Sequence, residues 1–449
     1  MKASFWILSL LICLSFAFSA SLNKLDTEDG VVAFSFHVHR GNTLEDATRY
    51  NRPYLSKRSN EDGTLSSTIL NEQSFYLANI SVGSSQQQIG VLLDTGSADM
   101  WLMSQSNPYC DSTVDCNKYG TFNESNSTTF ESNNTDFSIG YVDHRFATGE
   151  WGHDDITING VTVNQQSFAV ANKSNSSISV LGIGFAGLES TNDPTNGYTY
   201  ANLPIKMVEQ GIIKKSVYSL YLNSSQVSTG NILFGGVDHE KYTGSLQTVE
   251  IVNTDSDSSK PITVAVTLSS ISVGSNVVTS QTSAALLDSG TTAIYAPSAV
   301  FTALGEALGA SYSSALGAYT FNCIDESNDT AVTFDFTGAQ INVTLYELQI
   351  DVSELSSSVS DANGSCAISI FKSSDSSYIL GDVFLTSAYV VYDLENYQVS
   401  LAQSNQNSTE TNIEVIQSTV PSASTAKYYS STWSGSSSSS SSSSSASTS

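Results

Sequence analysis

Two acidic motifs with matching flanks are the residues of this sequence best suited to chemistry. In each, an apolar run ends in an aspartate, a hydroxyl residue, a glycine and a second hydroxyl residue. The motifs are Asp94-Thr95-Gly96-Ser97 and Asp288-Ser289-Gly290-Thr291. Such a run predicts a buried strand that delivers a carboxylate to a tight turn, where glycine permits the backbone geometry. Two carboxylates a few ångströms apart cannot both ionise easily, so they hold one proton between them.

That arrangement would suit amide hydrolysis. The ionised aspartate can deprotonate a trapped water while the protonated one polarises a peptide carbonyl, without a covalent intermediate or a metal. We therefore expect Asp94 and Asp288 to be the catalytic pair, and we expect no cofactor and no metal. The hydroxyl and glycine residues that follow each aspartate would support the pair. One such motif arises by chance in roughly one chain in fifty, whereas two in matching frames are far rarer.

Further matching segments indicate that the chain repeats itself. Residues 79–83, before the first motif, match residues 270–274, before the second. Residues 180–182 and 379–381, which follow the two motifs, also match. Three matches in the same order imply the duplication of a β lobe. The alternating apolar and polar runs likewise predict a mainly β protein.

The two motifs, together with residues 218–223, 234–238 and 379–385, resemble the pepsin-like aspartic endopeptidases of the secreted fungal branch, the candidapepsins and yapsins. The resemblance extends over about residues 75–403 and implies a bilobal β fold with the active cleft between the lobes. The absence of an acidic insertion in the short segment 110–116 favours candidapepsins over yapsins.

The resemblance also implies a flap hairpin that closes over the substrate. Tyr141 would be the flap tyrosine, with Val142 and Asp143 beside it; the alternative is that Tyr141 is one of 21 tyrosines filling a sheet. Relatives usually carry small residues where Val142, His144 and Arg145 stand, which leaves the subsite preference open.

Both ends of the chain differ in composition from the middle. Residues 1–19 predict a secretory signal peptide, with an uncleaved anchor as the alternative. Residues 20–58 predict a propeptide that ends at the dibasic pair Lys57-Arg58, with an uncleaved, disordered N-terminus as the alternative. We assign residues 59–250 and 251–403 to the two lobes and residues 404–449 to a Ser-rich, low-complexity tail without a GPI signal.

The cysteines agree with export, and the net charge limits the possible binding partners. Four cysteines remain beyond the signal peptide, and an even number in an exported protein predicts two disulfides. Of three possible connectivities we favour Cys110–Cys116 and Cys323–Cys366, because each pair then stays within one half of the chain. The net charge of −26 argues against binding to nucleic acid or to anionic membranes.

We expect a monomeric, acid-active endopeptidase that is made as a zymogen. A processing protease would cleave it at the dibasic site, and it would act on protein or peptide substrates. We expect it to be secreted, and the Ser-rich tail raises the question of cell-wall association. Many Asn-x-Ser/Thr acceptors fit a glycosylated surface. The alternative is an inert cell-wall glycoprotein that uses the same fold for binding.

Overall fold

The computed structural model describes residues 30–40, 74–110, 114–141, 145–192, 197–224, 229–352, 365–374 and 377–434. The predicted signal peptide, the Lys57-Arg58 site, Val142 and Asp143 lie outside these ranges, as do residues 435–449. Within the described ranges, no helix has both the length and the apolar character needed to cross a bilayer.

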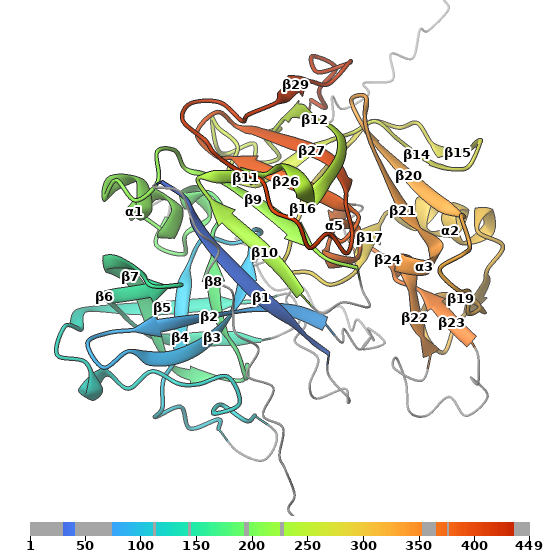
Figure 1. Ribbon diagram of the computed structural model, residues 1–449. Helices are drawn as coiled ribbons and strands as arrows, with labels where there is room; N and C mark the ends of the chain where they lie inside the picture. Colours follow the sequence, from blue (N-terminus) through green and yellow to red (C-terminus); the bar gives the residue numbers. More distant parts are fainter. Residues whose placement is uncertain are drawn as a thin grey trace, which may run out of the picture.

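A 14-stranded sheet runs through the molecule in the order β29-β12-β27-β26-β9-β10-β1-β2-β3-β8-β4-β7-β6-β5 (Figure 1). Its strands before residue 240 are β1 (Val32–Arg40), β2 (Ser74–Val82), β3 (Gln87–Asp94), β4 (Met100–Met103), β5 (Glu131–Gly140), β6 (Phe146–Ile158), β7 (Val161–Ser174), β8 (Ser179–Gly182), β9 (Val217–Leu222) and β10 (Thr229–Phe234). The later strands are β12 (Tyr242–Glu250), β26 (Ala388–Asp393), β27 (Gln398–Ser404) and β29 (Ala423–Thr425).

Four smaller sheets complete the β structure. A five-stranded sheet contains β13 (Ala265–Leu268), β16 (Ser283–Leu287), β25 (Tyr378–Leu380), β17 (Ile294–Ala296) and β24 (Ile370–Lys372). The two four-stranded sheets are β15 (Asn276–Thr279), β14 (Ser270–Val273), β20 (Ala331–Phe336) and β21 (Ala339–Thr344), and β18 (Ser311–Ser313), β19 (Ala318–Asn322), β23 (Ser365–Ile368) and β22 (Gln349–Asp351). A two-stranded sheet pairs β11 (Gly236–Asp238) with β28 (Ile413–Val415).

The helices of the described residues are short. They are α1 (Leu203–Glu209), α2 (Ser298–Ala307), α3 (Leu345–Leu348) and α5 (Asp382–Leu385), with 3₁₀ turns at Glu124–Asn126, Ala186–Leu188 and His239–Lys241. Strands β2–β8 lie on one side of the molecule and strands β14, β15 and β19–β24 on the other, with β9, β26 and β27 between them (Figure 1). The prediction of a mainly β, bilobal fold is therefore confirmed.

The duplication is visible in the strands that carry the aspartates. β3 pairs in parallel with β8, so that Asp94 lies opposite Gly182. β16 pairs in parallel with β25 in the same way, with Leu287 opposite Leu380. The third match is less regular, because β2 pairs directly with β3 whereas β14 belongs to a separate sheet. Two of the three sequence matches thus correspond to equivalent pairings.

Strands from both predicted lobes belong to one sheet. β26 pairs with β9, and β27 pairs with β12, so the 14-stranded sheet crosses the predicted boundary between residues 250 and 251. β1, from the predicted propeptide, lies between β10 and β2 and is hydrogen-bonded on both sides. The middle of the molecule is therefore built from segments that are far apart in the sequence.

The prediction of a low-complexity tail from residue 404 onward is wrong for residues 405–434, which we call the C-terminal strap. β28 of the strap pairs with β11, and β29 pairs in parallel with β12. Ile416 is fully buried, and its N–H donates to Gly235 O at 2.8 Å. Three-residue strands need only one or two apolar anchors, which is too few to produce periodicity in the sequence.

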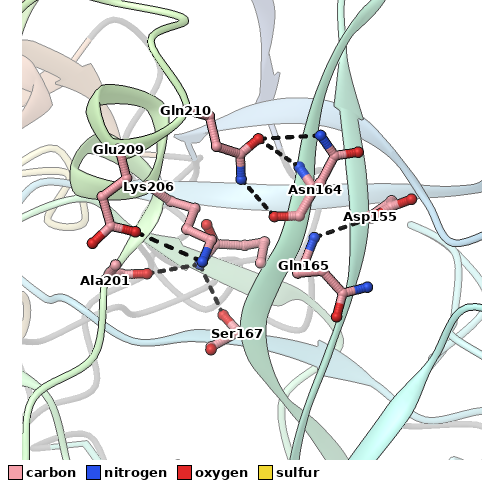
Figure 2. Close-up of polar contacts among 9 residues, drawn as sticks. Asp155, Asn164, Gln165, Ser167, Ala201, Lys206, Glu209 and Gln210 are labelled. Carbon is pink, nitrogen blue, oxygen red and sulfur yellow. Dashed lines mark hydrogen bonds and ion pairs between the residues drawn. The ribbon is translucent and has the colours of Figure 1, made fainter.

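Helix α1 is held against β7 by a glutamine side chain that forms two hydrogen bonds with the β7 backbone (Figure 2). Oε1 of Gln210, just after α1, accepts the N–H of Asn164 at 3.0 Å. Its Nε2 donates to Asn164 O at 2.6 Å. Residues 197–202, which lead into α1, are fixed in turn by Asn202, whose Nδ2 donates to Gly184 O at 2.8 Å. This anchoring holds residues 197–202 close to the first aspartate turn.

Candidate active site

The two aspartates end buried strands and accept matching hydrogen bonds. Asp94 is the last residue of β3 and Asp288 directly follows β16; both are fully buried. The N–H of Gly96 donates to Asp94 Oδ1 at 2.8 Å, and the N–H of Gly290 donates to Asp288 Oδ1 at 2.8 Å. A side-chain hydroxyl completes the pattern in each turn. Ser97 Oγ donates to Asp94 Oδ2, and Thr291 Oγ1 donates to Asp288 Oδ2.

The two carboxyl groups lie side by side. A Cβ placed on Gly96 would come within 2.5 Å of Asp288 Oδ1, so only glycine fits at this position. Burial and then the neighbouring Asp288 raise the pKa of Asp94 well above its ordinary value, against the lowering effect of the hydrogen bonds from Ser97 and Gly96. The structure therefore brings together the two residues that the sequence selects, in surroundings where one shared proton is favoured.

Reciprocal hydrogen bonds lock one turn to the other. The N–H of Thr95 donates to Ser289 Oγ at 3.2 Å, and the N–H of Ser289 donates to Thr95 Oγ1 at 3.0 Å. The Thr95 hydroxyl donates to Leu287 O and the Ser289 hydroxyl donates to Leu93 O, each at 3.0 Å. The Thr95 and Ser289 hydroxyls thus form their bonds between the two turns, which fixes the spacing of the aspartates.

The predicted flap tyrosine lies at the end of a β-hairpin. β5 and β6 pair up to Gly140 and Phe146, and the N–H of Tyr141 donates to Arg145 O at 2.8 Å. The Tyr141 side chain is buried, and its hydroxyl accepts the indole N–H of Trp101 at 2.7 Å. The hairpin is thus tied to the strand that follows the first aspartate turn. This contact between Trp101 and Tyr141 was not predicted from the sequence.

Both predicted disulfides are confirmed. Cys110 bonds to Cys116, with a sequence separation of 6, and Cys323 bonds to Cys366, with a separation of 43. Each bond lies within one half of the chain, as expected. In the described part of the chain, no group of three or more His, Cys, Asp or Glu side chains could hold a metal ion.

Sequence analysis missed a cluster of buried acids beside the first turn. Asp99 and Glu189 are almost completely buried, and the Tyr200 hydroxyl donates to Asp99 Oδ1 at 2.9 Å. The N–H of Tyr200 donates to Glu189 Oε2 at 2.7 Å. Burial raises the pKa of Asp99 and raises that of Glu189 to about 9. Their only signal in the sequence was the position of Asp99, two residues after the first motif.

A comparison with known protein families identifies the class to which this site belongs. Residues 75–404 match the family model described as eukaryotic aspartyl protease. The chain therefore belongs to the eukaryotic aspartyl proteases, and it is an aspartic endopeptidase that acts on peptide substrates. The inert binding protein that we considered as an alternative is not favoured.

Individual relatives agree with this assignment. The chain is similar to aspartic proteinase yapsin-3 of Saccharomyces cerevisiae, at 40% identity over 88% of this chain and 80% of that protein. It is similar to secreted aspartic protease 9 of Candida albicans, at 36% identity over 85% of this chain and 86% of that protein. It also matches an acid protease of Saccharomycopsis fibuligera, at 36% identity over 88% and 97%, respectively.

The resemblance to the candidapepsin and yapsin branch is thus confirmed. Our preference for candidapepsins over yapsins finds no support, because the identity with the yapsin, 40%, exceeds the 36% with the Candida protease. The short disulfide-bonded segment between Cys110 and Cys116 does not separate the two groups, because a surface loop tolerates insertions and deletions at little energetic cost.

Proposed function

We propose that this chain is an exported, acid-active endopeptidase in which Asp94 and Asp288 activate water with one shared proton. The observation that carries the proposal is the pair of buried, adjacent carboxyl groups, each held by one backbone N–H and one hydroxyl. These donors bond both oxygens of each carboxyl group and so fix its orientation. They leave the shared proton between two acids whose pKa values belong to the pair rather than to either residue.

The reaction follows from this geometry. The ionised aspartate takes a proton from a water molecule as the water oxygen attacks the carbonyl carbon. The protonated aspartate gives its proton to the carbonyl oxygen, so that a neutral tetrahedral diol forms. Breakdown returns a diol proton to one aspartate, while the departing nitrogen takes up the proton of the other. The peptide C–N bond breaks and the pair regains its single proton.

The residues around the pair have supporting roles in this proposal. Gly96 and Gly290 supply backbone N–H donors, Ser97 and Thr291 supply hydroxyl donors, and Thr95 and Ser289 keep the turns together. Tyr141 would cover the substrate, with Val142 and Asp143 completing the hairpin tip. Closure of the hairpin would exclude water and hold the peptide extended, paired like a strand.

We further propose that the protein is made as a zymogen with residues 20–58 as the propeptide. The support is that β1 occupies an interior position of the central sheet, with Val32 and Ala33 buried. A processing protease would cleave after Lys57-Arg58, and residues 59–250 and 251–403 would form the two lobes of the monomeric enzyme. The name of the secreted Candida relative supports export through the signal peptide, and residues 435–449 are the candidate segment for cell-wall association.

Incubation of the purified, processed protein with denatured haemoglobin at pH 4, with and without pepstatin, tests the proposal. We expect pepstatin-sensitive cleavage with a bell-shaped pH profile whose limbs report the two constants of the aspartate pair. The matched control is the Asp94→Asn protein, purified in the same way. Absence of cleavage by the wild type, or a flat profile from pH 4 to pH 8, would overturn the assignment.

A further inference from the structure

Tyr200 contacts both the segment that follows the first aspartate turn and the flap hairpin. Its hydroxyl donates to Asp99 Oδ1 at 2.9 Å. Its ring meets that of Trp151, on β6, edge to face, with the two centroids 5.1 Å apart. Trp151 packs in the same way against Phe137 of β5, at 5.2 Å. β5 and β6 are the arms of the hairpin that ends at Tyr141, so one side chain links both arms to the region of the catalytic pair.

Asp99 is fixed relative to the first aspartate. Its Oδ2 accepts the N–H of Ser190 at 2.8 Å. Its backbone oxygen accepts the N–H of Gly182 at 3.0 Å, and Gly182 lies opposite Asp94 in the pairing of β3 with β8. A Cβ placed on Gly182 would come within 2.7 Å of the Asp99 backbone nitrogen, so the two segments are in close contact. A displacement of Asp99 therefore also displaces the strand beside Asp94.

The backbone around Tyr200 is fixed as well. The N–H of Tyr200 donates to Glu189 Oε2 at 2.7 Å. The backbone oxygen of the next residue, Ala201, accepts a hydrogen bond from Gln166 Nε2 at 3.4 Å. Gln166 belongs to β7, which pairs with β6 of the hairpin. Tyr200 is therefore held at its backbone, at its hydroxyl and at its ring, and it forms a rigid bridge between the two regions.

This bridge is costly in free energy. Asp99 and Glu189 are both buried, and burial of carboxyl groups is unfavourable. Among the described residues, Glu189 Oε1 has no hydrogen-bond partner. Well-packed apolar side chains would fill a similar space without this cost. A costly polar contact at this position points to a function in addition to stability.

A second contact ties the tip of the hairpin to the same short segment. The indole N–H of Trp101 donates to the Tyr141 hydroxyl at 2.7 Å, and Trp101 is only two residues beyond Asp99. The aromatic side chains of both contacts belong to one buried apolar cluster or, for Tyr200, pack against it. A single contact would leave the hairpin free to rotate about that point. Two contacts, one at the tip and one on the arms, fix its orientation.

We propose that Tyr200 is a positioning residue for substrate binding, which holds the flap hairpin over the aspartate pair through Asp99 on one side and Trp151 on the other. Contacts between the hairpin and a bound peptide are present both before and during the reaction. Such contacts lower KM and leave kcat unchanged. Tyr200 therefore contributes to the affinity for substrate through the hairpin, without touching the substrate itself.

The inference rests on the proposed function, in which the hairpin covers a peptide bound at Asp94 and Asp288. Cleavage by the wild type and its loss in Asp94→Asn test that function without any change at Tyr200. Hydrogen exchange of the hairpin amides tests the bridge without any need for activity. An inactive wild type would refute the proposed function, whereas an unaltered hairpin in Tyr200→Phe would refute only the bridge.

The test compares Tyr200→Phe with Tyr221→Phe as the matched control. Tyr200→Phe keeps the ring and removes the bond to Asp99. Tyr221→Phe removes a bond of similar length, from the Tyr221 hydroxyl on β9 to Asn405 O at 3.0 Å, outside the hairpin. We expect Tyr200→Phe to raise KM for a peptide substrate about 5-fold at unchanged kcat. Amides of β5 and β6 should exchange about 5-fold faster by mass spectrometry. The control should leave KM and the hairpin amides unchanged.

A second variant approaches the bridge from the hairpin side. Trp151→Phe shortens the side chain that reaches Tyr200 and leaves the hydrogen bonds of Asp99 in place, so it should also raise KM. The double variant should not exceed the larger single effect, because both changes break the same link. If Tyr200→Phe does not fold, Trp151→Phe decides, and an unchanged KM in that variant would overturn the proposal.

Thermal unfolding of the same proteins separates positioning from a purely structural role. A lower melting temperature of Tyr200→Phe with wild-type KM and wild-type hairpin exchange would assign the hydroxyl to stability and overturn the proposal. A fall in kcat at constant KM would overturn it as well, because Tyr200 would then act on the aspartate turn instead of the hairpin.

Discussion

The turn that carries Asp94 and the turn that carries Asp288 make the same hydrogen bonds in different surroundings. Five residues after Asp94 stands Asp99, a buried acid that contacts Tyr200 and lies near Glu189. Five residues after Asp288 stands Ala293, which belongs to an apolar cluster with Leu316, Ala318 and Phe371. The duplicated lobes have thus kept the catalytic geometry symmetric, while their surroundings differ in how they respond to pH.

The symmetry of the pair is tested by Asp94→Asn and Asp288→Asn. We expect each to lower kcat by roughly four orders of magnitude and to leave the fold intact, because an amide has the size of the carboxyl group and keeps one acceptor oxygen but cannot take a proton from water. Steady-state cleavage of a peptide substrate at the optimal pH measures the loss. Retention of more than a tenth of wild-type turnover by either variant would contradict the shared role.

The two disulfides, one in each half of the chain, should contribute unequally to the free energy of unfolding. Replacement of Cys323 and Cys366 by serine releases a loop with a separation of 43, and replacement of Cys110 and Cys116 releases one of only 6. The chain-entropy relation gives losses of about 4 and about 2.4 kcal/mol in the free energy of unfolding. Urea unfolding of the two serine variants measures both. Equal losses would show that loop length does not govern their contributions.

The buried acids should make the first half sensitive to pH. The folded-state pKa of Glu189, about 9, lies above the ordinary value of 4.5, so the folded protein binds this proton more tightly than the unfolded chain does. The resulting stabilisation is complete below about pH 4.5 and is lost as the pH rises toward 9. Glu189→Gln keeps an acceptor for the Tyr200 N–H and should raise the free energy of unfolding at pH 7 by up to about 3 kcal/mol.

Urea unfolding of Glu189→Gln between pH 4 and pH 8 measures this effect. The variant should lose stability less steeply than the wild type as the pH rises. Glu209→Gln, on exposed surface of α1, is the control and should follow the wild-type slope. Parallel slopes for wild type and Glu189→Gln would place the pH sensitivity elsewhere in the molecule.

The smallest expected effect concerns the bonds between the turns. Thr95→Val leaves the Ser289 N–H without its acceptor, and Ser289→Ala leaves the Thr95 N–H without its acceptor. Each should lower the free energy of unfolding by about 1–3 kcal/mol, since an unsatisfied buried donor remains. Thr333→Val, on β20, is the control. Markedly unequal losses for Thr95→Val and Ser289→Ala would show that the turns are not equivalent.

Local motifs in the sequence were sufficient to predict the aspartate turns, and the even number of cysteines, with each pair kept within one half of the chain, was sufficient to predict the disulfides. The reciprocal bonds of Thr95 and Ser289 and the contact between Trp101 and Tyr141 were not predictable, because each depends on the packing of segments distant in the chain. Glu189 was missed for the same reason, since an acidic residue in a polar segment normally indicates exposed surface. The C-terminal strap lacked any periodic pattern.

The central sheet also constrains the biosynthesis of the protein. β1 ends at residue 40 and β26 begins at residue 388, so some of the earliest and latest strands belong to one sheet. At about 5–20 residues per second, translation separates them by roughly 20 to 70 s. Until β26 emerges, β9 has an open edge, the kind of surface on which nascent chains aggregate. Release from the ribosome, rather than completion of the first lobe, should therefore set the moment at which this protein can finish folding.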